Sequence, residues 1–124
     1  METNEQKARV TTYFDESKGW QGDLYTSEDS YFSRVINRRK EYALEMIRAL
    51  PDLQRGKVLD VGCGSGVYLK EFFSMGFDCY GLDISQEMVE ACGRLLGAEE
   101  HPDRIHLSRG EVEKLPFPDA TFDL

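Results

Sequence analysis

The sequence has no long hydrophobic run. No apolar stretch approaches the roughly 20 residues that a membrane-spanning helix needs, and residues 1–9 are polar and charged. A secretory signal would need an apolar stretch close to that end, so the sequence predicts a cytoplasmic protein without a membrane span. The chain has 124 residues, which is room for one small domain and not for two.

Cysteine, histidine and tryptophan are scarce. The chain contains three cysteines, two histidines and one tryptophan, and Cys63, Cys79 and Cys92 are not spaced as the CxxC pairs of a zinc site. The sequence therefore predicts three small buried thiols in a reducing compartment, and no metal site.

Basic residues are also fewer than acidic ones. Lysine and arginine number 15 against 23 aspartates and glutamates, which gives a formal net charge of -8. An acidic surface repels a phosphate backbone, so nucleic acid is not expected as a partner. One basic cluster runs against this trend, and its alternation with apolar residues predicts a solvated helix face; its members are Arg34, Arg38, Arg39 and Lys40.

Hydrophobic periodicity predicts helices before and between short strands. Residues 1–29 suggest a short helix followed by irregular chain, and a clear helix follows at 31–50, capped by Ser30 and stopped by Pro51. Its buried stripe is expected to comprise Phe32, Val35, Ile36, Ala43, Met46, Ile47 and Leu50. Strands are predicted at 57–61, at 77–82 and around Ile105 and Leu107, with the opening of a fourth at 121–124.

The helices between these strands are predicted at 67–75 and from Ser85 to Gly97, where serine caps the start and glycine ends the helix. The stripe expected to be buried on the second of them is Met88, Cys92, Leu95 and Leu96. Strands that alternate with helices of this length form a parallel α/β sheet through right-handed crossovers.

A glycine-rich turn at Gly62, Gly64 and Gly66 follows the first strand directly. Glycines at such a turn let the backbone approach a ligand closely, although a tight turn without any ligand is the alternative. Asp60 stands two residues before the first glycine, where a carboxylate would oppose a pyrophosphate and favour a cationic ligand instead. A purely structural cap is the other interpretation of Asp60.

Two further acidic positions follow the second and third strands. Asp83 ends the second strand about 20 residues beyond the glycine loop, where parallel α/β folds bind a ribose diol with a carboxylate; a helix cap is the alternative. After the third strand, Glu111 is the candidate for accepting a hydrogen bond from an exocyclic amine, and Val112 for packing on a purine face. Taken alone, that stretch is an ordinary acidic loop.

These segments together resemble the three cofactor motifs of the class I S-adenosylmethionine-dependent methyltransferases. VLDVGCGSG, which includes Cys63, resembles the motif that supports the methionine part of the cofactor. YGLDISQEMVEAC resembles the second motif, which implies that Asp83 holds the ribose hydroxyls and that Ile84 flanks the adenine. RGEVEKLPFPDATFDL resembles the third, although most relatives have Asp-Ala where this chain has Glu111-Val112.

The resemblance implies a Rossmann-like parallel sheet of which this chain holds about three strands and the start of a fourth. Residues 1–54 would form an N-terminal helical cap, and residues 55–124 the first half of the S-adenosylmethionine-binding domain. An incomplete sheet would leave the edge of the first strand unpaired and available for self-association.

The implied activity is methyl transfer from S-adenosylmethionine to a small-molecule acceptor, with this chain supplying the cofactor-binding half and lacking activity alone. No catalytic residue can be named from the sequence. Two alternatives remain: a non-catalytic cofactor-binding module, and a nicotinamide-dependent oxidoreductase domain, which Asp60 and the glycine spacing disfavour.

Overall fold

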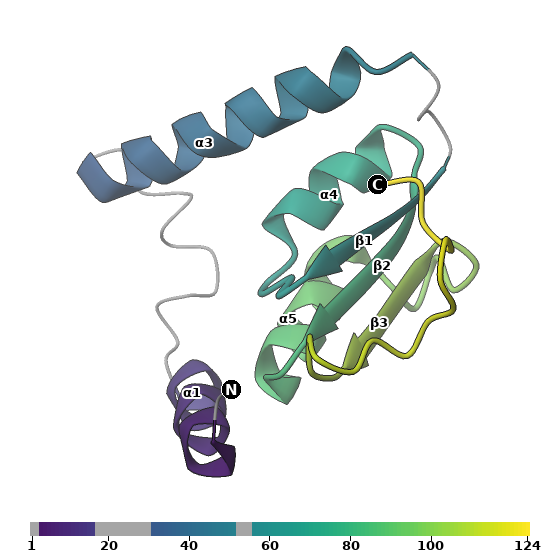
Figure 1. The fold of residues 1–124 in the computed structure, drawn as a ribbon. Coiled ribbons are helices and arrows are strands. Elements are labelled where there is room, and N and C mark those ends of the chain that lie inside the picture. Colours follow the sequence, from purple (N-terminus) through teal and green to yellow (C-terminus); the bar gives the residue numbers. More distant parts are fainter. Residues whose placement is uncertain (1–2, 17–30, 52–55) are drawn as a thin grey trace.

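The computed structural model describes residues 3–16, 31–51 and 56–124 (Figure 1). Two helices come first, and strands then alternate with helices. The elements in chain order are α1 (Asn4–Glu16), α3 (Tyr31–Arg48), β1 (Lys57–Val61), α4 (Val67–Ser74), β2 (Asp78–Asp83), α5 (Gln86–Leu96) and β3 (Ile105–Arg109). The predicted cap of α3, Ser30, lies outside the described residues.

The three strands form a parallel sheet in the order β1-β2-β3. Val58 on β1 is in register with Cys79 on β2, which is in register with Ile105 on β3. All three side chains are buried in one core cluster together with Leu69 and Phe72 of α4. The parallel α/β architecture predicted from the alternation of strands and helices is therefore confirmed.

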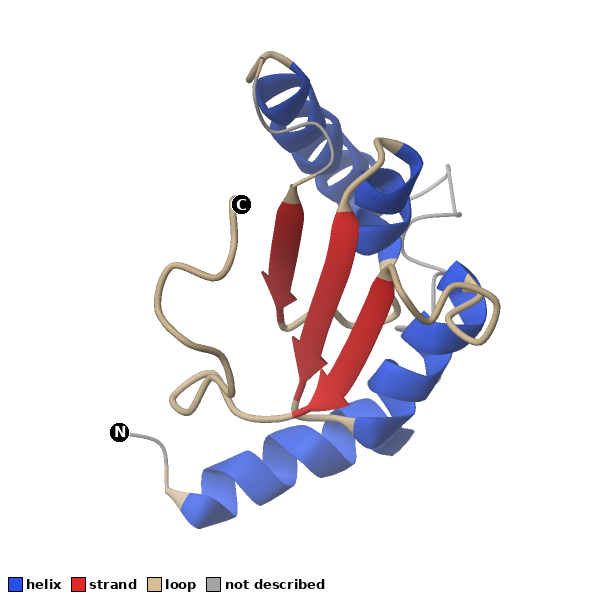
Figure 2. Ribbon diagram, turned by 90° about the vertical axis from the view of Figure 1, so that its right-hand side faces the viewer, coloured by secondary structure: helices blue, strands red, loops and turns tan. Residues whose placement is uncertain are grey.

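The other face of the sheet is covered by the chain that follows β3. Tyr80 alternates with the buried Cys79 along β2 and stacks on His106, with ring centroids 4.4 Å apart. Phe117 and Phe122 meet the Tyr80 ring edge-on at 5.9 and 5.1 Å. Figure 2 shows this segment running along the side of the sheet opposite α4 and α5.

The last residues of the chain hydrogen-bond to β1. The Leu59 N–H donates to the carbonyl oxygen of Leu124 at 3.0 Å, and the Asp123 N–H donates to that of Lys57 at 2.9 Å. Residues 121–124 thus lie beside β1, and the fourth strand predicted to open there has no regular strand structure. The prediction that the edge of the first strand is unpaired is wrong between Lys57 and Leu59. Backbone groups of both residues form hydrogen bonds with residues 123 and 124.

Helix α5 begins and ends at the predicted residues. The Ser85 hydroxyl accepts a hydrogen bond from the Met88 N–H, and Gly97 takes the left-handed conformation that ends the helix. The predicted stripe is wrong at Leu95, which is 44% exposed. The buried face of α5 is centred on Cys92, so Leu95 lies at its margin in the last turn.

The buried face of α3 differs from the prediction by about a quarter-turn. Ser33 and Leu44 are its buried residues, whereas the predicted Phe32, Val35, Met46 and Leu50 are exposed. The remaining predicted residues, Ile36, Ala43 and Ile47, are half-buried. Apolar residues occupy two faces of this helix, and only the face that holds Leu44 joins the core.

The predicted solvated face of α3 is confirmed for the three arginines of the basic cluster, which are all exposed. The fourth member, Lys40, is only 17% exposed and lies 3.8 Å from the Glu71 carboxylate on α4. This contact joins α3 to α4.

The glycine turn between β1 and α4 requires glycine for two different reasons. Gly62, Gly64 and Gly66 all have positive φ, at 74°, 54° and 90°. A Cβ added at Gly62 or Gly64 would meet nothing within 4 Å, whereas at Gly66 it would lie 2.5 Å from Cys92 Sγ. Gly66 therefore lets α5 pack against the turn, and the other two glycines only set the direction of the backbone.

This difference predicts unequal costs for two alanine substitutions. Gly62→Ala is expected to lower the free energy of unfolding by about 1–2 kcal/mol, the cost of left-handed backbone alone. Gly66→Ala should cost about 2–4 kcal/mol, because overpacking against α5 adds to that strain. Urea denaturation followed by circular dichroism measures both. Equal losses would show that the Cys92 contact imposes no steric demand.

Candidate functional site

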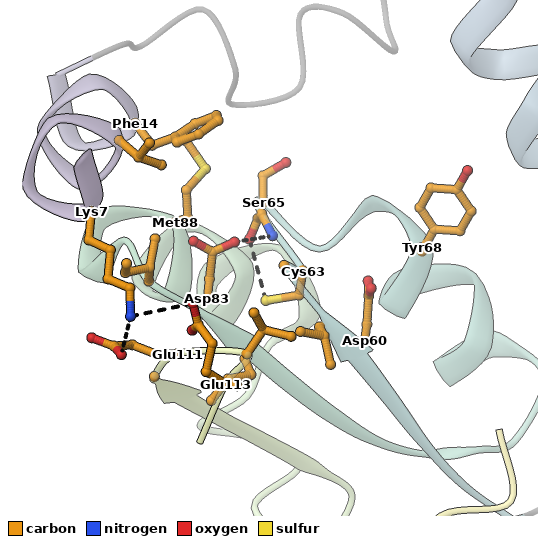
Figure 3. Close-up of a pocket in the computed structure, with 18 of the residues that line it drawn as sticks. Lys7, Phe14, Asp60, Cys63, Ser65, Tyr68, Asp83, Met88, Glu111 and Glu113 are labelled. Atoms are coloured by element: carbon orange, nitrogen blue, oxygen red, sulfur yellow. Dashed lines mark hydrogen bonds and ion pairs between the residues drawn. The ribbon is translucent and has the colours of Figure 1, made fainter. Parts of the chain in front are cut away.

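One cavity of about 660 Å³ opens at the carboxyl ends of β1 and β2 (Figure 3). Small-molecule sites in parallel α/β folds lie at this end of the sheet and have volumes of this order. The walls come from the glycine loop, the end of β2, the loop after β3, and α1, which lies beyond the strand ends in Figures 1 and 2.

Asp60 and Asp83 both line this cavity. The register pairs Asp60 with Gly81, so Asp83 stands only two residues further along the neighbouring strand. Figure 3 shows both carboxyl groups rising from this end of the sheet. The two acids predicted as site residues therefore lie at one cavity beside the glycine turn.

The Asp83 carboxylate ties the glycine loop to the start of α5. One of its oxygens accepts a hydrogen bond from the Gly64 N–H at 2.9 Å, and the other accepts one from the Ser85 N–H at 2.9 Å. Charge-assisted bonds of this kind are stronger than neutral ones. Asp83 thus acts as a backbone anchor and also presents negative charge to the cavity.

Asp60 is partly desolvated in the same place. Burial raises the pKa of its carboxyl from 3.8 to about 6, and the nearby negative charge of Asp83 adds to the increase. Lys7 also lines the cavity, but its ion pairs among the described residues are with Glu111 and Glu113, so the negative charge of the two aspartates stays unpaired there. A positively charged ligand would relieve this cost.

The cavity wall contributed by the glycine loop is largely apolar at Cys63. The pKa of this thiol is raised, first by its hydrogen bond to the Cys92 thiol and then by burial. All three cysteines are free and buried, and burial raises the pKa of Cys79 to about 12. The thiols of Cys63 and Cys79 are therefore protonated at neutral pH, and all three buried cysteines pack as small hydrophobic groups, as predicted.

Two glutamates after β3 are bound by a lysine from α1. Lys7 Nζ lies 2.9 Å from Glu111 Oε2 and 3.4 Å from Glu113 Oε1 (Figure 3). The hydrogen bond to Glu111 is the main cause of a raised pKa at Lys7. The pKa of Glu113 is lowered, mainly by a hydrogen bond from its own backbone and further by Lys7. This pairing joins α1 to the loop that forms one wall of the cavity.

The opposite end of α1 is held by Asp15. Its carboxylate accepts a short hydrogen bond from the Ser85 hydroxyl and a longer one, 3.4 Å, from the Glu87 N–H. Between the two anchors, Val10 and Phe14 line the cavity, yet α1 has no buried residue. The helix therefore covers the site mainly through polar contacts at its two ends.

Residues 58–124 match a family described as the methyltransferase domain. The chain belongs to this family. A sterol 24-C-methyltransferase of Gibberella zeae is 33% identical over 109 residues, an alignment that covers 85% of this chain and 28% of that protein. The chain thus spans less than a third of the length of this curated relative.

Solved structures share the fold of this methyltransferase domain. Magnesium protoporphyrin IX methyltransferase from Synechocystis, with bound S-adenosylhomocysteine, superposes with a TM-score of 0.74 at 20% identity, covering 88% of this chain and 53% of that one. The [4+2]-cyclase SpnF superposes with a TM-score of 0.71 at 20% identity, covering 94% and 47%. At such identities the likeness concerns the fold alone.

The cavity brings together nearly all the site residues predicted from the sequence of this methyltransferase domain. Those that line it are Asp60, Gly62, Cys63, Gly64, Asp83, Ile84, Glu111 and Val112. Gly66 does not line it, because this glycine is occupied by its packing against Cys92 and Leu96.

Several lining residues were not predicted. Lys7 and Phe14 come from α1, Tyr68 and Met88 from the first turns of α4 and α5, and Glu113 from the loop after β3. Tyr68 and Met88 follow the predicted loops so closely that proximity could have suggested them. Lys7 carries no such signal, because it lies 104 residues from its partner Glu111.

The raised pKa of Asp60 predicts that this carboxyl destabilises the folded domain at neutral pH. Its folded pKa, about 6, exceeds the starting value of 3.8, so the folded state loses stability as the pH rises through this window. Asp60→Asn is expected to raise the free energy of unfolding by about 1–3 kcal/mol above pH 6. Below pH 3.8, where the carboxyl is protonated in both states, the substitution should have no effect. Asp103→Asn, an exposed loop substitution, is the control. Urea titrations that give the same gain at pH 4 and pH 8 would contradict the assignment.

The ion pairs of Lys7 predict that removing this side chain loosens α1 and leaves the rest of the domain unchanged. Lys7→Met is expected to raise amide hydrogen exchange in residues 4–16 by about two- to tenfold, because it frees one end of a helix with no buried residue. Arg9→Met is the matched control, since Arg9 pairs only with Glu5 on the same helix among the contacts described. Mass spectrometry of peptides measures both. Equal exchange in the two variants would show that the glutamates do not hold α1.

Proposed function

We propose that this methyltransferase domain binds S-adenosylmethionine in the cavity at the strand ends and supports methyl transfer to a small-molecule acceptor. The observation that carries the proposal is the convergence of Asp60 and Asp83 on one cavity beside the glycine loop. Two acids that form no ion pair among the described residues suit a ligand with an ammonium and a sulfonium group better than one with phosphates.

The lining residues fit the parts of this cofactor. Asp83 would accept hydrogen bonds from the ribose hydroxyls, and Ile84 and Val112 would flank the adenine. Glu111 would accept from the adenine amine, for which it must share or lose its bond to Lys7. The glycine loop and Asp60 would meet the methionine portion. A cavity of about 660 Å³ is large enough for a nucleoside with an amino-acid tail.

In the proposed reaction the cofactor supplies an activated methyl group, and the chain supplies position and electrostatics. Asp83 fixes the glycine loop through Gly64, which sets the orientation of whatever rests on that loop. The apolar wall at Cys63 and Met88 excludes water from the site. We name no general base, and the cofactor-binding half is the contribution that we assign to this chain.

A small-molecule acceptor is supported by what the relatives are named for. One relative is a sterol methyltransferase, and a structure with the same fold is a methyltransferase of a magnesium porphyrin. Both acceptors are bulky and largely apolar. We propose an acceptor of this general class and a cytoplasmic location.

A second candidate is a cofactor-binding module without methyl transfer, favoured by the likeness of fold to a cyclase. A methyltransferase assay with a protein that contains this domain together with the rest of the sheet separates the two. Transfer of a labelled methyl group to an acceptor supports the main proposal, and tight cofactor binding without any transfer supports the module.

Calorimetric titration with S-adenosylhomocysteine tests the site directly. Asp83→Asn is expected to weaken binding by about 1–3 kcal/mol, because one acceptor oxygen is replaced by a donor. Asp78→Asn is the matched control, since it removes the same charge from the far end of β2. A nicotinamide dinucleotide is titrated in parallel. Binding of the dinucleotide but not of S-adenosylhomocysteine would contradict the proposal and favour the oxidoreductase alternative.

A further inference from the structure

Helix α3 presents an apolar stripe to solvent on the side opposite its buried face. Tyr31, Val35, Tyr42 and Met46 lie within about 60° of one another around the axis, given about 3.6 residues per turn. Their exposed fractions are 79%, 37%, 53% and 73%. Because the buried Leu44 is on the opposite side, this stripe is not used for packing against the domain.

Arginines flank this stripe on both sides. Arg38 lies on one side, with its guanidinium carbon 4.4 Å from the centre of the Tyr42 ring and its Nη2 donating to the Tyr42 hydroxyl at 3.0 Å. Arg39 lies on the other side and is exposed. The solvent-facing side of α3 thus combines apolar groups with Arg39 and with Arg38, whose guanidinium also lies 3.5 Å from the Glu41 carboxylate.

The charge of α3 is opposite to that of the chain. The helix has five basic and two acidic residues, whereas the whole chain has a net charge of -8. At physiological ionic strength the Debye length is about 8 Å, so a surface in contact with α3 experiences mainly the charge of this helix. The surface that complements α3 is therefore both anionic and able to accept apolar side chains.

We propose that α3 docks on an anionic lipid surface, lying in the plane of the headgroups. Helices with an apolar stripe bordered by arginine bind at such interfaces without spanning them. Tyrosine places its ring among apolar groups and its hydroxyl in water, and arginine reaches the lipid phosphates. None of the described helices has the length and apolarity needed to cross a membrane.

A second copy of the chain is a poorer occupant. A symmetric contact places the same patch of each copy against the other, which would bring the excess positive charge of the two α3 helices together. The α3 surface is also separate from the cavity, because no residue of α3 lines it. Docking is therefore independent of the proposed cofactor.

Flotation with lipid vesicles tests this docking on the full chain. One set of vesicles is phosphatidylcholine alone, and the other is phosphatidylcholine mixed with phosphatidylserine. The chain should float with the second set and not with the first, and added salt should release it. Met46→Glu and Arg39→Glu should each reduce the bound fraction on the order of tenfold.

Two substitutions on α5 are matched controls. Leu95→Glu and Arg94→Glu introduce the same chemical changes at exposed positions of another helix, and should bind like the unchanged chain. Circular dichroism checks the folding of every variant, and because Arg39 is exposed, its variant tests the proposal even if Met46→Glu fails to fold.

Failure of the chain to float with phosphatidylserine vesicles would overturn the proposal. So would α3 variants that float as well as the α5 controls do. Light scattering that detects a dimer, dissociated by Met46→Glu, would assign the stripe to a second copy and overturn the lipid assignment.

Discussion

The carboxylate of Asp83 holds together the parts on which the site depends. One of its oxygens receives the Gly64 N–H and the other the Ser85 N–H, so a single side chain fixes the glycine loop against the start of α5. The parallel register of β1 and β2 brings this carboxylate to the same edge as Asp60. Without that register, the two acids would not face a common cavity.

This arrangement concentrates negative charge and thereby lowers the free energy of unfolding at neutral pH. Asp60 is desolvated and faces a second acid, which raises its pKa to about 6. Such unfavourable electrostatics persist only where the surrounding structure holds them, and they are typical of binding sites. In the function that we propose, the same charge density that weakens the free chain favours a cationic nucleoside. Stability and recognition are therefore opposed at this position.

Local patterns predicted much of the fold and of the site. The alternation of strands and helices along the chain followed from apolar runs, and the caps at Ser85 and Gly97 followed from residue type alone. Asp60 was predicted because it stands two residues before the glycine turn, and Asp83 because it ends the second strand, where parallel α/β folds bind ligands. All these inferences use residues close together in the sequence.

Features that depend on distant contacts were not predicted. Hydrophobic periodicity alone does not distinguish the two apolar faces of α3. The face that holds Leu44 is buried because it contacts the core. Gly66 was assigned to ligand binding because it shares a motif with Gly62 and Gly64. In the structure it packs against α5 instead. The Lys7 pairing joins residues 104 apart, and no local rule connects them.

The polar attachment of α1 has a kinetic consequence. Since this helix has no buried residue, lifting it away exposes little hydrophobic surface, and water can replace the contacts that it loses at Lys7 and Asp15. Entry and departure of a bound molecule then need no disruption of the sheet. The residence time of such a molecule is expected to shorten as ionic strength rises, so exchange rate and core stability are set by separate parts of the chain.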